Sequence, residues 1–190
     1  MDLYNKKGRA ELIKQLKDEP FSRVTVSFYR YVEIKNPQEF RDSIYRKLSE
    51  LRVLGRIYIA YEGMNAQISI PEHNQGKTIK YIHSISSLNG VEIKSAIVDG
   101  DSFFKLTIKV KNEIVAYGID KNEYDMDVVG KHLDPDDFNR CIDNKDSVVV
   151  DIRNHYESEV GHFKGALKPD VERSQDLLPE VKRLLANQED

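Results

Sequence analysis

The sequence of 190 residues contains no tryptophan, and its one cysteine is Cys141. A single thiol excludes an intrachain disulfide, which favours the reducing environment of the cytoplasm. No apolar run approaches the roughly 18 residues that a membrane-spanning helix needs, and the first residues lack the apolar core of a secretion signal. The glycines are scattered, so neither a phosphate-binding P-loop nor a dinucleotide-binding motif is present. We therefore expect a cytoplasmic protein with no membrane partner and no evident cofactor.

An excess of charge of one sign is also lacking. Lysine and arginine residues number 29 against 32 aspartates and glutamates, and the formal net charge is −3. No global electrostatic field therefore draws the protein to nucleic acid, and RNA binding would need a local basic patch. The five histidines show no metal-ligand spacing, so we expect no metal site.

The first half of the chain alternates strand and helix patterns. Residues 24–29 alternate apolar and polar side chains, which is the period of a half-buried strand. Asn36, Pro37 and Glu39 form a helix start signal, with an N-cap, a proline at the first helical position and a glutamate that reaches back to the cap. The other predicted elements are strands over residues 56–61, 66–70, 91–98 and 103–110, a hairpin turn at 62–65 and a second helix over 71–87. This order predicts a ferredoxin-like α+β fold with an added strand and two helices on one sheet face.

The second half predicts the beginning of an α/β domain after a polar linker. Asp134 and Pro135 repeat the helix start signal, and residues 148–150 are three valines without alternation, as expected of a parallel strand buried on both faces. A lone parallel strand has no partners for its backbone groups, so we expect the natural protein to be longer. We divide the chain into a peripheral N-terminal helix (1–20), a ferredoxin-like domain (21–118), a linker (119–133) and the first part of an α/β domain (134–190).

Five side chains of the second half are candidates for chemistry. Cys141 is expected mid-helix on an apolar face, which predicts a packed structural cysteine and not a nucleophile. Asp151, Arg153, Glu157 and His162 could converge as an acid/base cluster beside a substrate. The alternative is that they hold the loop after the strand in shape. We favour this alternative for Glu157 and His162 and leave both interpretations open for Arg153.

The first half offers a candidate RNA-binding surface. If Leu106 and Ile108 face the helices, the alternating Lys105, Lys109 and Lys111 line the opposite face of the sheet. The same surface is expected to include Arg23, Tyr29 and Arg30. Lysines beside an aromatic side chain on an open sheet contact phosphates and stack bases in several RNA-binding folds. The alternative is that the lysines only keep an exposed sheet face solvated.

Three stretches resemble a known family: Ser27-Phe28-Tyr29-Arg30-Tyr31, the run Glu62-Gly63-Met64-Asn65-Ala66-Gln67-Ile68-Ser69, and Asp151-Ile152-Arg153 with the following Glu157, Gly161 and His162. They look like the bacterial rhodanese-domain tRNA uridine hydroxylases, in which an acylphosphatase-like domain precedes a rhodanese domain. Tyr61 stands where a histidine is common.

The resemblance implies that residues 134–190 begin a rhodanese-like domain whose loop is supported by Asp151, Arg153, Glu157 and His162. It implies tRNA as partner and substrate, with molecular oxygen as co-substrate for hydroxylation of the wobble uridine at C5. It also implies a catalytic loop cysteine beyond Asp190, so that none of the present residues is catalytic.

Two other functions stay open on the residues alone. The rhodanese-like half suggests a sulfurtransferase acting on thiosulfate. The first half could also serve as a non-enzymatic module that binds RNA or protein.

Overall fold

The computed structural model describes residues 3, 7–95, 103–120, 122–126, 128–153 and 155–186. The chain divides into two units, Met1–Ile114 and Val115–Asp190. The predicted end of the first domain at residue 118 therefore falls a few residues inside the second unit.

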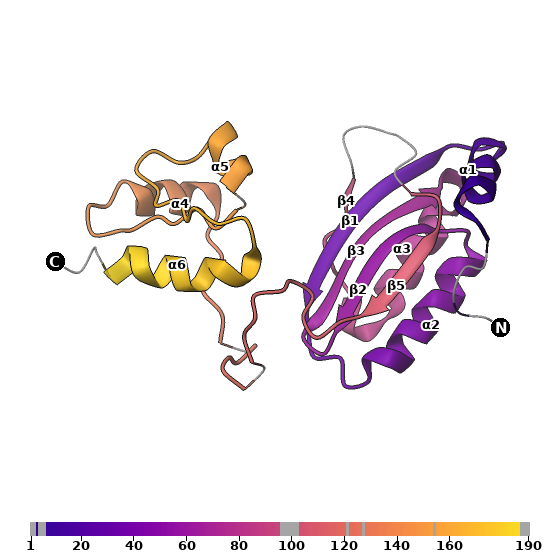
Figure 1. Ribbon diagram of the computed structural model, residues 1–190, viewed down its shortest axis with the longest axis horizontal. Coiled ribbons are helices and arrows are strands. Elements are labelled where there is room, and N and C mark those ends of the chain that lie inside the picture. The colour runs from indigo at the N-terminus through magenta and orange to yellow at the C-terminus, as the bar shows by residue number, and fades with distance from the viewer. Residues whose placement is uncertain are drawn as a thin grey trace. The chain divides into compact units, whose positions relative to one another are not determined.

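The first unit contains a five-stranded sheet with the order β4-β1-β3-β2-β5 (Figure 1). Its strands are β1 (Arg23–Tyr31), β2 (Leu54–Ala60), β3 (Gly63–Pro71), β4 (Lys94–Ser95) and β5 (Leu106–Val110). Neighbouring strands are antiparallel except β2 and β5, which are parallel. This arrangement confirms the ferredoxin-like fold, with β5 as the strand added at the β2 edge.

Two helices, α2 (Pro37–Glu50) and α3 (Gln75–Ser84), cover one face of this sheet (Figure 1). The predicted cap of α2 is confirmed, because Asn36 accepts a hydrogen bond from the Glu39 backbone N–H at 3.2 Å and donates one to the Glu39 carboxylate at 3.1 Å. The shorter helix α1 (Arg9–Lys17) buries none of its residues. The core between the helices and the sheet is made by alternate strand residues, among them Val26, Phe28, Ile57, Ile59 and Ile68.

Some boundaries in the first unit differ from the prediction. The hairpin turn is at Tyr61 and Glu62, and residues 63–65 already belong to β3. The helix predicted over 71–87 is divided into α3 and two flanking 3₁₀ turns, Glu72–Asn74 and Ser86–Leu88. Of the strand predicted over 91–98, Lys94–Ser95 is a strand, and residues 96–98 lie outside the described residues.

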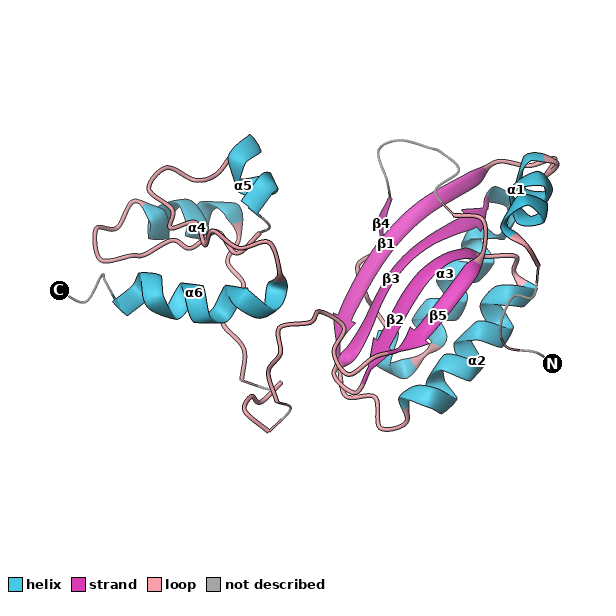
Figure 2. Cartoon of the chain, in the orientation of Figure 1, coloured by secondary structure: helices cyan, strands magenta, loops and turns pink. Residues whose placement is uncertain are grey.

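The second unit contains helices α4 (Pro135–Ile142), α5 (His155–Val160) and α6 (Ser174–Ala186), which are joined by loops (Figure 2). Asp134 caps α4 as predicted, since its carboxylate accepts a hydrogen bond from the Asp137 backbone N–H at 2.8 Å. The prediction of a fully buried strand at 148–150 is wrong. Within the described part of this unit, the backbone around Val150 makes a single parallel bridge to Leu167, and Val148 is 49% exposed. A backbone bridge joins two segments edge to edge, so it covers neither face of this segment.

Across the residues that the structure describes, no helix is both long and apolar enough to cross a membrane.

Candidate RNA-binding surface and rhodanese-like loop

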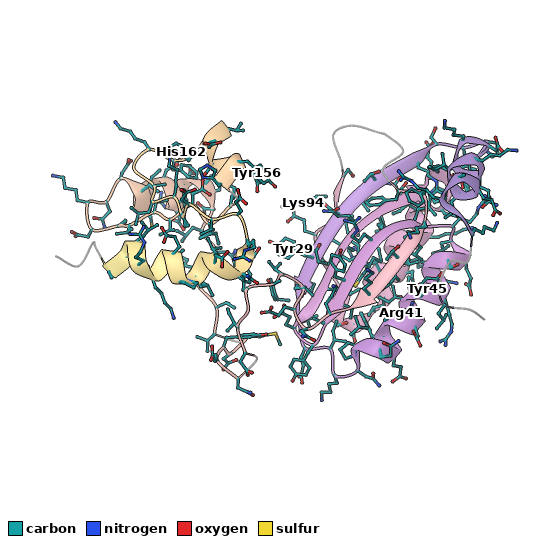
Figure 3. The ribbon with its side chains drawn as sticks, in the orientation of Figure 1. Tyr29, Arg41, Tyr45, Lys94, Tyr156 and His162 are labelled. Atoms are coloured by element: carbon teal, nitrogen blue, oxygen red, sulfur yellow. The ribbon has the colours of Figure 1, made fainter. Side chains whose placement is uncertain are left out.

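The sheet face opposite α2 and α3 presents two rows of polar and aromatic side chains. Successive strand residues point to opposite faces of a sheet, so the residues that alternate with the core residues lie on this face. In the register of the sheet, one row is Tyr29, Asn65, Tyr58 and Lys109, and the next is Lys94, Ser27, Gln67, Arg56 and Thr107. We call these two rows together with Lys111 the open face. Figure 3 shows Tyr29 and Lys94 on the side of the sheet away from Arg41 and Tyr45 of α2.

Cations and aromatic rings lie together on the open face. The Lys111 ammonium is 5.8 Å from the centroid of the Tyr58 ring, and Lys109 is the register partner of Tyr58 on β5. Lys94 lies at the other edge of the sheet, with the Glu92 carboxylate 3.9 Å from its ammonium. The face therefore combines positive charge with stacking surface, the two features that RNA-binding sheets use.

Four residues of the open face, Arg56, Tyr58, Asn65 and Lys94, were not assigned to it from the sequence. The signal that could have found Arg56 and Tyr58 is their alternation with Ile57 and Ile59, which are fully buried. Lys94 could not be assigned in this way, because its strand has only two residues and is too short to show the alternation of apolar and polar side chains.

The structure separates Lys105 from the other candidate lysines. Lys105 precedes β5, and its ammonium is 5.9 Å from the centroid of the Phe104 ring. It lines a cavity near α1, together with Arg23 and Arg52.

Arg23 and Arg30 do not join the open face. The Arg23 side chain is 7% exposed, because its guanidinium donates to the Glu19 carboxylate at 2.6 Å and to the Ser69 carbonyl oxygen at 3.0 Å. Arg30 pairs with the buried Met64 and shares the strand face of Val26 and Phe28, which is the core face. We therefore leave both arginines out of the proposed RNA-binding surface.

The run from Glu62 to Ser69 mainly builds the fold. The buried Glu62 carboxylate accepts a hydrogen bond from the Ile114 backbone N–H at 2.7 Å, which fixes the chain after β5. Gly63 has a φ of +144°, and a Cβ at this position would overlap the Arg30 carbonyl oxygen. Asn65 and Gln67 of this run belong to the open face, and its other residues are buried. The sequence similarity in this run therefore largely reflects the fold.

The four loop residues of the second unit are brought close together. Arg153 donates to both carboxylate oxygens of Asp151, from Nε at 2.9 Å and from Nη2 at 2.5 Å, and also donates to the Gly161 carbonyl oxygen at 2.6 Å. The hydrogen bonds from Arg153 hold the pKa of Asp151 at about 2, well below its ordinary value. These bonds tie the segment after Val150 to the loop beyond α5, which favours loop support as the role of Arg153.

The other two loop candidates act on the same segment. The ring nitrogen Nδ1 of His162 lies 2.8 Å from the Ser158 carbonyl oxygen, and Glu157 attracts the Arg153 guanidinium electrostatically. Both interactions are internal to the loop, and both agree with a supporting role.

Cys141 is exposed, in contrast to the prediction of a packed cysteine. It lies in the last turn of α4 and lines a cavity of about 750 Å³ with apolar side chains that include Phe138, Ile142 and Phe163. The residue is on the apolar face as expected, but no described residue of α4 is buried. At the C-terminal end of a helix the unpaired groups are carbonyls, so α4 itself directs no cradle of backbone N–H groups at this thiol. In the described ranges, histidine, cysteine, aspartate and glutamate side chains form no group of three that could hold a metal ion.

Comparison with known proteins identifies relatives of the chain. Residues 23–114 match the family model described as the UPF0176 acylphosphatase like domain. Over nearly its whole length the chain is similar to curated proteins named tRNA uridine(34) hydroxylase. The relative from Leptospira interrogans is 45% identical over 188 residues, which are 98% of this chain and 51% of the relative.

The relative from Photorhabdus laumondii is 40% identical, and that from Salmonella newport is 39% identical, each over 99% of this chain and 54% of the relative. The chain is a homologue of the tRNA uridine(34) hydroxylases. The resemblance seen in the sequence is thus confirmed, and the chain spans about half the length of the curated relatives it matches.

Proposed function

We propose that the open face of the first unit binds tRNA, and that the whole protein hydroxylates the uridine at tRNA position 34. The observation that carries the proposal is the row Tyr29, Asn65, Tyr58 and Lys109, which places aromatic rings, an amide and a cation side by side on the sheet face opposite α2 and α3. The names of the homologues support tRNA as the substrate class. Molecular oxygen is the co-substrate that the resemblance implies.

The second unit has a supporting part in this proposal. Its Arg153 joins the Asp151 carboxylate to the Gly161 carbonyl oxygen, so the pair positions a loop and does not act on substrate. Cys141 is not the proposed nucleophile, because it lies at the carbonyl end of α4. A loop cysteine of the whole protein would take that role. With a single thiol among its 190 residues, the chain is consistent with the cytoplasm as the place of reaction.

The test uses the whole protein, together with tRNA isolated from cells that lack this protein. After incubation in air, the tRNA is digested to nucleosides, which are separated and identified by mass spectrometry, and 5-hydroxyuridine is the expected product. A parallel assay measures thiocyanate formed from thiosulfate and cyanide. Formation of thiocyanate without 5-hydroxyuridine would show that the protein is a sulfurtransferase and not a hydroxylase. Binding of tRNA with neither product would show that the protein is a non-enzymatic binding module.

A further inference from the structure

The open face carries one aromatic ring that the fold does not use. Tyr29 is 63% exposed, on the face opposite the core residues Val26 and Phe28 of the same strand. Its ring contacts that of Tyr31 edge-on, with 6.5 Å between the ring centroids and 76° between the planes. Tyr29 projects from the sheet in Figure 3. Burial in the core therefore does not explain this side chain.

The neighbours of Tyr29 in the sheet supply complementary polar chemistry. Asn65 is its register partner on β3, and the same Asn65 is the register partner of Tyr58 on β2. Adjacent strands are about 4.8 Å apart, so the amide lies within reach of a planar group that rests on the Tyr29 ring. An asparagine amide both donates and accepts hydrogen bonds, as the edge of an unpaired base requires.

Charge selects the class of occupant. The two rows contain the cations Arg56, Lys94 and Lys109, and none of the residues that form them is acidic. Lys111 adds a fourth cation over the Tyr58 ring, whereas the Tyr29 ring contacts the ring of Tyr31. In a chain whose net charge is −3, this local excess of positive charge favours a polyanion as the occupant.

We propose that Tyr29 is a stacking platform for one unpaired base of an RNA single strand, with Asn65 contacting the edge of the base and Lys109 and Lys111 contacting the flanking phosphates. The inference rests on the proposed function, since it assumes that the open face binds RNA. A base in a duplex has both its faces covered by neighbours, so the platform recognises a loop or single strand and not a stem.

The first experiment removes the ring from the 190-residue chain. Tyr29→Phe keeps the aromatic face, and Tyr29→Leu keeps apolar area without it. With a short oligouridine as the probe, Tyr29→Leu should bind about 5- to 150-fold more weakly, the effect of losing one stacked base, and Tyr29→Phe should bind like the parent chain. An abasic ribose-phosphate oligomer of equal length should bind the three proteins equally. Tyr156→Leu is the matched control, because Tyr156 is 66% exposed but belongs to the second unit.

The second experiment uses the absence of tryptophan from the chain. Tyr29→Trp introduces a unique tryptophan at the platform, and the tryptophan emission should change on titration with oligouridine but not with the abasic oligomer or a duplex of the same length. Equal binding of the Leu and Phe variants, or an emission that the abasic oligomer changes as much as oligouridine, would overturn the stacking platform.

These outcomes are separate from failure of the proposed function. If Lys109→Ala/Lys111→Ala weakens RNA binding while Tyr29→Leu does not, the open face binds RNA without the platform. If neither variant changes binding, both the platform and the RNA-binding role of the open face are wrong.

Discussion

The pair Lys109 and Lys111 gives the sharpest test of the open face. Each lysine that contacts a phosphate contributes about 0.7–0.9 to the slope of log K against log salt, so Lys109→Ala/Lys111→Ala should lower that slope by about 1.4–1.8. Over a rise from about 50 to 200 mM salt, the affinity of the parent chain for tRNA should then fall about 7- to 12-fold more than that of the variant. The two proteins should thus differ most at low salt.

Stability sets the second expectation for this variant. Lys109 is exposed, and Lys111 makes one cation–π contact with Tyr58 at 5.8 Å. An exposed cation–π contact contributes about 0.5–1 kcal/mol, and other surface changes stay within about 0.5 kcal/mol, so the free energy of unfolding should fall by roughly 1 kcal/mol.

The assay is fluorescence anisotropy of labelled tRNA over a salt series, with thermal melting of each variant. The control is Lys77→Ala/Lys80→Ala, which removes the same charge from two exposed positions of α3, in the helical layer on the other side of the sheet. Equal slopes for the two double variants would refute the phosphate contacts. A stability loss above about 3 kcal/mol for the open-face variant would show instead that these lysines are buried in the folded protein.

Three further predictions concern the fold, the loop and the thiol. Gly63→Ala should lower the free energy of unfolding by at least about 1–3 kcal/mol, because alanine is strained at φ +144° and its Cβ overlaps the Arg30 carbonyl. Gly76→Ala, which meets open space on α3, should not destabilise, and equal denaturation midpoints would contradict the argument. The lowered pKa of Asp151 means that folding favours the carboxylate, so its contribution to stability is present above about pH 4 and is lost as the pH falls toward about 2. Asp151→Asn should therefore be less stable than the parent at neutral pH and converge with it at the acid end, and a constant difference across that range would count against the Arg153 pair. Cys141→Ser in the whole protein should keep its tRNA hydroxylation, whereas a ~10²-fold loss of rate in a folded variant would identify Cys141 as a catalytic group.

Short-range signals in the sequence determined the elements and the order in which they occur. The caps at Asn36 and Asp134 were predicted because a cap bonds to a backbone N–H three residues away, so all its parts are visible in one short stretch. Alternation in β1 likewise separated Val26 and Phe28 from Tyr29, because the strand period is a property of the backbone itself. The family could be identified for the same reason, since its runs are contiguous.

Tertiary structure decided which of these side chains are available for binding. The sequence predicts Arg23 as a cation of the RNA-binding surface, but in the fold its guanidinium is bonded to the Glu19 carboxylate and the Ser69 carbonyl oxygen. Cys141 lies on the apolar face that the sequence predicts, yet it is exposed, because burial depends on what packs against a helix and not on the helix alone. The row that joins Tyr29, Asn65 and Tyr58 exists only through pairing between strands that are distant in the chain. Local sequence sets the conformation of each segment, but contact between segments is a property of the whole fold, and the candidate site is made of such contacts.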